Sequence, residues 1–198
     1  MKQTTIILLL CLLFNSTHTS AYDRNQLFGG WLVTSGDCKN TREKVLIRDS
    51  LIPVILDEKG CTVISGLWVD PYTAKVFKEP KLLDIDHIVP LKEAYESGAN
   101  EWDKEQRLAI ANDMDNLLVV WSASNRSKQN KDPSKWMPPN ISFWTTYIDK
   151  WCKVKEKYNL RTDVAEMIAI ENHKKIAITH HKGINITTFN IPVDNSNK

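Results

Sequence analysis

The sequence predicts an α+β fold in which short strands and several helices share one core. Between residues 61 and 89 apolar side chains recur with a period of two, which is typical of strands, whereas residues 141–178 carry them at helical spacing. A chain of 198 residues with 42% hydrophobic residues is long enough for one globular domain. We therefore predict a single domain at residues 22–180.

Residues 1–21 are predicted to be a secretory signal that is not part of the fold. Lys2 precedes the apolar run 6–14, and small or polar residues follow as far as Ala21, which is the order found in cleaved signals. An uncleaved anchor is the alternative, but the run is short for a bilayer span, and no other segment is long and apolar enough. The mature chain is expected to be secreted or periplasmic, without a membrane span.

The formal net charge of the chain is +2, so the sequence does not resemble a strongly basic nucleic-acid packaging protein. Any contact with nucleic acid must come from local patches and should be sensitive to salt. The oligomeric state stays open.

The cysteines indicate a disulfide rather than a metal site. Cys11 leaves with the signal, and Cys38 and Cys61 flank a segment that can close as a loop in an oxidising compartment, so we predict a bond between them. Cys152 is interpreted as a buried thiol on a helix, with intermolecular pairing as the alternative. No Cys-x-x-Cys or zinc-finger spacing occurs in the sequence.

The first helix of the mature chain is expected after Asn40, whose side chain can cap it, with Glu43 completing a capping box. Its apolar stripe extends to Leu51, and Pro53 interrupts it. An N-terminal β-hairpin follows, with a strand at 61–69, a turn at 70–73 and a returning strand at 74–77.

Two further strands and a series of helices complete the expected order. Residues 82–89 form a strand candidate that Pro90 stops, and the apolar run 117–121 forms its counterpart. Helices are expected at 91–97, 101–112, 124–129, 141–158 and 163–178, and residues 181–198 are interpreted as a flexible tail.

The helix expected at 141–158 carries an aromatic stripe that we assign to the core. It includes Tyr147 and Trp151 at helical spacing. Asp163 can cap the next helix, with Glu166 completing a capping box.

Polar side chains gather where the two strand candidates end. Asp86 and His87 lie near the end of the first strand, and Asn125 follows the second strand near the start of a helix. A neutral imidazole accepts a proton near neutral pH, and carboxylate and amide oxygens suit Mg²⁺ or Mn²⁺. Arg126 and Lys128 add positive charge for a phosphate. Together these groups form a minimal set for one-metal phosphodiester hydrolysis.

Each of these residue types also has a purely structural interpretation. Asp86 could be a solvated acid, Asn125 could be a helix cap, and Arg126 and Lys128 could lie on a solvated helix face. The residue types alone do not decide between these alternatives.

Strand geometry restricts how the site can form. A regular strand sends Asp86 and His87 to opposite faces, so both reach one phosphate only if the strand breaks or the metal sits at its edge. Asp84 shares the face of Asp86 and could support it, although an exposed strand acid is the simpler interpretation. Asn116 precedes the second strand and is expected to brace the loop that carries His87.

The runs 84–90 and 125–128, with Asn116 between them, resemble the HNH nuclease motif in its His-Asn-Asn form. Further segments narrow the resemblance to secreted HNH endonuclease-like proteins related to the C-terminal domain of GmrSD-type restriction enzymes. It covers most of the mature chain and implies a ββα-metal (HNH/His-Me finger) core with additional helices. The further segments are 22–24, 41–42, 65–68, 70–73, 93–98, 111–117, 136–139 and 151–160.

The resemblance implies that His87 is the general base, that Asp86 and Asn125 hold one divalent ion, and that Asn116 has a positioning role. Many HNH enzymes carry a histidine where Asn125 stands, and an amide oxygen favours Mg²⁺ or Mn²⁺ over Zn²⁺. The expected activity is hydrolysis of nucleic acid, with DNA favoured over RNA. Because an unperturbed histidine has a pKa of about 6.5, acid is expected to slow the reaction.

Two other functions stay open from the sequence. One is a secreted nucleic-acid-binding or effector domain that kept the fold and lost catalysis, which the near-neutral charge mildly favours. The other is a metal-stabilised interaction module that ignores nucleic acid. The insertion at 91–113 either shapes substrate access or fills one side of the core.

Overall fold

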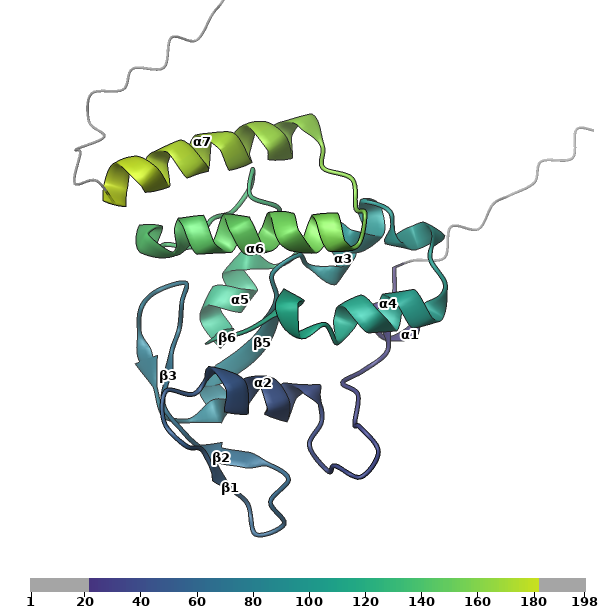
Figure 1. Ribbon diagram of the computed structural model, residues 1–198, viewed down its shortest axis with the longest axis vertical. Helices are drawn as coiled ribbons and strands as arrows, with labels where there is room; N and C mark the ends of the chain where they lie inside the picture. Colours follow the sequence, from purple (N-terminus) through teal and green to yellow (C-terminus); the bar gives the residue numbers. More distant parts are fainter. Residues whose placement is uncertain (1–21, 182–198) are drawn as a thin grey trace, which may run out of the picture.

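The computed structural model describes residues 22–181 and shows several helices around small two-stranded sheets (Figure 1). This mixture agrees with the predicted α+β class. The strands are β1 (Ile55–Leu56), β2 (Val63–Ser65), β3 (Trp68–Val69), β4 (Val76–Phe77), β5 (Leu83–His87) and β6 (Leu117–Trp121). The helices are α1 (Arg24–Phe28), α2 (Thr41–Asp49), α3 (Leu91–Glu96), α4 (Lys104–Ala111), α5 (Ser122–Lys128), α6 (Trp144–Lys157) and α7 (Val164–His181).

The strand pair β5–β6 lies at the centre of the molecule. The two strands run antiparallel in continuous register, from Leu83 opposite Trp121 to His87 opposite Leu117. Both strands were predicted, and α5 follows β6 without an intervening loop. The result is a strand–strand–helix unit whose last helix returns against β5.

The strand pair separates two hydrophobic clusters because alternate side chains point to opposite faces. Leu83 and Ile85 pack with α2 and with Trp68, whereas Leu118 and Val120 pack with α6. In Figure 1, α2 lies below the strand pair, and α6 and α7 lie above it. Cover on both faces explains why β6 is apolar along nearly its whole length.

The prediction of a single N-terminal hairpin is wrong, because the structure has two short hairpins in this part of the chain. β2 pairs with β1, which was not predicted, and β3 pairs with β4. The predicted strand 61–69 breaks at Gly66, where an added Cβ would lie 2.5 Å from the ring of Trp68. The indole packs over the bare backbone, so the chain changes partner at this point.

Several predicted helix boundaries also need correction: α4 and α6 each begin three residues later than predicted, and α7 ends three residues later. The Asn40 side chain caps α2 by accepting from the Glu43 N–H, as expected, but Glu43 does not complete a capping box, because its carboxylate accepts from the Val63 N–H. Leu51 lies beyond the helix and is 65% exposed. Ser50 adopts an extended conformation, and the N–H of Leu51 bonds to the Leu67 carbonyl instead of continuing the helix. Helix α5 begins two residues earlier than predicted, at Ser122.

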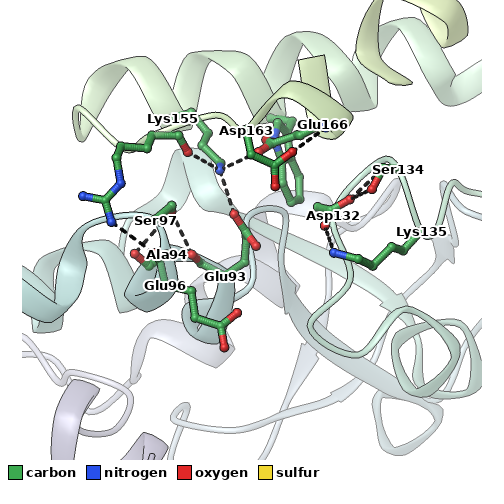
Figure 2. Close-up of polar contacts among 12 residues, drawn as sticks. Glu93, Ala94, Glu96, Ser97, Asp132, Ser134, Lys135, Lys155, Asp163 and Glu166 are labelled. Carbon is green, nitrogen blue, oxygen red and sulfur yellow. Dashed lines mark hydrogen bonds and ion pairs between the residues drawn. The ribbon is translucent and has the colours of Figure 1, made fainter. Parts of the chain in front are cut away.

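The aromatic stripe of α6 belongs to the core, as predicted, because Tyr147 and Trp151 are fully buried. The buried ammonium group of Lys155 links α6 to its neighbours (Figure 2). Lys155 donates to Glu93 of α3 at 2.7 Å and to Glu166 of α7 at 3.0 Å, and its third bond goes to the Arg161 carbonyl at 2.7 Å. All three protons of the ammonium group are therefore used.

The predicted disulfide is present between Cys38 and Cys61, and it ties the segment between α1 and α2 to the start of β2. Cys152 lies half-buried on α6 and carries a free thiol. The predicted signal and the tail beyond His181 fall outside the described residues. No helix of residues 22–181 has the length and apolar character needed to cross a membrane.

Replacing Cys38 and Cys61 together by serine should lower the free energy of unfolding by about 3 kcal/mol, because the bond closes a loop with a sequence separation of 23. Urea unfolding under oxidising conditions measures the loss. The variant Cys152→Ser is the control and should change stability by less than about 1 kcal/mol. Equal stability of the double variant and the wild type would contradict the expectation.

Candidate functional site

A pocket of about 490 Å³ lies beside β5 and α5. Four polar residues singled out in the sequence line it: Asp84, Asp86, His87 and Asn125. Strand β5 stays regular through His87, so the first of the two arrangements left open by the sequence, a break between Asp86 and His87, does not occur. Consecutive residues of β5 line the pocket, so the pocket follows the edge of the strand. This agrees with the second arrangement, in which the site lies at the strand edge.

His87 is held in one tautomer. Its Nε2 lies 2.9 Å from the carbonyl oxygen of Ala111, which can only accept, so Nε2 carries the hydrogen. In a neutral ring Nδ1 then has a free lone pair, and no group among residues 22–181 forms a hydrogen bond with it. Trp31 stacks on the imidazole with 5.5 Å between ring centroids and 9° between planes. The ring is therefore fixed, with an acceptor nitrogen available to a molecule in the pocket.

Burial lowers the pKa of His87 to about 3, although its hydrogen bond to Ala111 opposes this change. The positive charges of Arg24 and Lys128 lower the pKa further. His87 is therefore neutral throughout the range from pH 5 to 8. This corrects the expectation, based on an unperturbed histidine, that acid in this range slows the reaction.

Asp86 is the most enclosed acid of the site and is 5% exposed. Tyr72 donates its hydroxyl proton to Oδ2 at 2.5 Å, and Lys128 lies 3.0 Å from Oδ1 and 2.9 Å from Oδ2. Burial raises the pKa of Asp86, whereas Lys128 and Tyr72 oppose this change. The ammonium group of Lys128 also donates to the backbone carbonyl of His87 at 2.6 Å, so it binds both of the last two residues of β5.

Asn125 approaches β5 from α5. Its Nδ2 donates to Oδ2 of Asp84 at 3.1 Å, and its side-chain oxygen Oδ1 has no hydrogen-bond partner among residues 22–181. Because α5 begins at Ser122, Asn125 lies inside the helix and is not its cap. Asp70 fixes this helix by accepting from the hydroxyl of Ser124 at 3.1 Å.

Asn116 forms the bracing contact expected from the sequence. Its side chain is fully buried, accepts from the Val89 N–H at 2.9 Å and donates to the Val89 carbonyl at 3.2 Å. The backbone carbonyl of Asn116 accepts from the Ile88 N–H at 2.8 Å. These three bonds hold the two residues that follow His87, so Asn116 sets the direction in which the chain leaves β5.

The two cations predicted to contact a phosphate do not line the pocket. Lys128 is fully buried and bound to Asp86, which contradicts a role as a free phosphate ligand, and Arg126 lies exposed on the outer side of α5. Three other cations line the pocket: Arg24, Arg42 and Lys92. Arg42 is oriented by the carbonyl oxygens of Pro80 and Leu83. The sequence could have indicated Arg24 and Arg42 as site residues, because both lie inside segments that carry the family resemblance.

The side chains present fit a hard divalent cation by the chemistry of their donors. No group of three His, Cys, Asp or Glu residues suited to a metal occurs within 22–181. The candidate set instead combines the carboxylates of Asp84 and Asp86 with the amide oxygen of Asn125, all of which line one pocket. Oxygen donors of this kind suit Mg²⁺ or Mn²⁺. Lys128 limits how Asp86 can bind a metal ion, because the hydrogen bond from Lys128 leaves Oδ1 of Asp86 with only one further lone pair.

Comparison with known proteins gives two matches. A family model described as GmrSD restriction endonucleases, C-terminal domain, matches residues 42–170, which include every residue of the predicted site. A protein of Arthroderma benhamiae (strain ATCC MYA-4681 / CBS 112371) named as an uncharacterized secreted protein is 40% identical over 151 residues, or 75% of this chain and 72% of that protein. No solved structure matches.

The neutral state of His87 should appear in the pH dependence of stability. The pKa of His87 is about 3 in the folded chain and about 6.5 in the unfolded chain. The free energy of unfolding is therefore unaffected by protonation of this residue above pH 6.5 and decreases as the pH falls from 6.5 toward 3, because the unfolded chain then binds the proton more readily. Urea unfolding of metal-free protein should show that the advantage of wild type over His87→Asn shrinks by about 1.4 kcal/mol per pH unit below roughly pH 6. A constant advantage would contradict this.

Removing the ammonium group of Lys128 should destabilise the fold strongly. The variant Lys128→Met leaves the Asp86 carboxylate buried without its ion pair, and we expect a loss of about 3 kcal/mol or more in the free energy of unfolding. The double variant Asp86→Asn/Lys128→Met removes both charges and should recover part of that loss. Urea unfolding at neutral pH measures both, and a single variant as stable as wild type would rule out the ion pair.

Proposed function

Because the chain belongs to the family of GmrSD restriction endonuclease C-terminal domains, we propose that it is a secreted, divalent-metal-dependent HNH endonuclease. Family membership indicates a nuclease-related domain. The finer assignment is supported by one observation: His87, with its acceptor nitrogen free, shares a pocket with the oxygen donors Asp84, Asp86 and Asn125. Secretion is supported by the signal predicted at residues 1–21 and by the name of the fungal relative.

In the proposed reaction, Nδ1 of His87 takes a proton from the attacking water. The bond from Nε2 to the Ala111 carbonyl keeps the ring in the required tautomer, and it strengthens as the ring gains positive charge. Trp31 prevents the imidazole from rotating. Asn116 and Lys128 act on the backbone around His87, so they position the base and do not touch the substrate.

The remaining groups place the phosphodiester. Asp86 and Asn125, with Asp84 beside them, would hold one Mg²⁺ or Mn²⁺ ion, which when bound supplies positive charge for the phosphate and the leaving oxygen. Arg24, Arg42 and Lys92 add positive charge at the pocket walls. DNA is the favoured substrate because of the family, and attack by water does not exclude RNA.

The direct test is a nuclease assay on the mature chain with plasmid DNA and a panel of divalent ions. Wild type should cleave in Mg²⁺ or Mn²⁺ and lose activity in EDTA. The variant His87→Ala should lose at least about a hundredfold in rate, because general acid–base catalysis contributes this much or more. Because His87 stays neutral, the wild-type rate should not fall with acid between pH 5 and 8 through this residue.

The matched controls are Arg126→Gln and a melting curve for each variant. Arg126 is an exposed cation that does not line the pocket, so its removal should leave the rate nearly unchanged. Cleavage that persists in His87→Ala, or in EDTA, would reject the proposed mechanism. Binding of DNA without turnover in any ion would instead favour a domain that lost catalysis.

A further inference from the structure

The reacting groups of the proposed site are recessed. Asp86 is 5% exposed and His87 is 7% exposed, and both are reached through the 490 Å³ pocket. A pocket of this size encloses a small organic molecule, which is the scale of a single nucleotide. A phosphodiester must therefore enter the pocket with its own sugar or base to reach His87.

A continuous duplex meets this requirement poorly. Its phosphates are held on the outside of a stiff rod, and its bases are paired and stacked. Enzymes that do chemistry on a base in a recess either take single-stranded substrate or extrude the nucleotide from the stack, which costs unpairing and unstacking. A nucleotide of a duplex that entered this pocket with its sugar or base would meet the same cost. A free strand enters without that cost.

The walls of the pocket have the composition that binds single strands. Trp31 and Tyr22 contribute aromatic surface, and Arg24, Arg42 and Lys92 contribute positive charge. Aromatic rings stack with successive bases regardless of sequence, while cations follow the backbone. Trp31 is only half-buried although His87 stacks on it and it packs against the hydrophobic cluster around α2, so part of this residue still faces solvent.

We infer that the pocket takes a single-stranded segment of nucleic acid, with the scissile phosphate at His87 and a neighbouring base against Trp31. This inference rests on the proposed function and names its substrate class. Residues 22–31, which supply Tyr22, Arg24 and Trp31, lie outside the segment that matches the family. Arg42 and Lys92 lie inside that segment, so the wall combines residues from both parts of the chain.

The test compares three substrates that share one labelled strand: the free strand, its full duplex, and a duplex with an unpaired bubble. The free strand and the bubble should be cleaved at least about tenfold faster than the full duplex, because neither requires unpairing. Equal or faster cleavage of the full duplex overturns the inference and leaves the proposed function intact.

Binding in EDTA separates the two proposals if no substrate is cleaved. Fluorescence anisotropy of the same oligonucleotides should show tighter binding of the free strand than of the duplex. Loss of cleavage with that preference retained rejects the proposed function alone. Equal binding, preference for the duplex, or no binding rejects the single-strand site.

Variants of the wall test the role assigned to Trp31. The variant Trp31→Leu should weaken binding of the free strand by about tenfold, the size expected for one stacked base, and Trp31→Phe should restore most of it. Trp144→Leu is the matched control, because Trp144 is also half-buried but does not line the pocket. Unchanged binding by Trp31→Leu would overturn the stacking contact.

Discussion

The ion pair between Asp86 and Lys128 is the interaction on which the site depends. It joins β5 to the last residue of α5, and the same ammonium group holds the carbonyl of His87. Both charges are buried, so burial raises the pKa of Asp86 and lowers that of Lys128, and each charge is maintained by the other. Helix α5 is thereby held against the strand, which places Asn125 beside Asp84.

The rest of the site is built around that contact from segments far apart in the chain. Ala111, at the end of α4, fixes the tautomer of His87, and Asn116 fixes the backbone after it. Trp31 comes from the segment before α2, which the bond between Cys38 and Cys61 ties down. The helical insertion between β5 and β6 therefore does more than fill one side of the core, because the carbonyl of Ala111, the last residue of α4, determines which nitrogen of His87 is free.

The sequence predicted those parts whose signals are local. The alternating pattern of β5, the apolar run of β6, the Asn40 cap and the bracing position of Asn116 all follow from short patterns, and the structure contains them. The break at Gly66 depends on where the ring of Trp68 packs, and the two-residue strand β1 is too short to give a periodic pattern. Lys128 was misread for a different reason: its partner Asp86 lies 42 positions earlier, so nothing nearby in the sequence reveals that it is buried.

The origin of the pocket walls has a consequence for how such proteins can diverge. His87, the carbonyl that fixes its tautomer and the oxygen donors of the pocket all lie within residues 42–170, whereas part of the pocket entrance lies before them. Substitutions in that leading stretch can change which molecules enter the pocket and leave His87 and the oxygen donors in place. Relatives that share the segment 42–170 can in this way come to bind different molecules at the same set of polar groups.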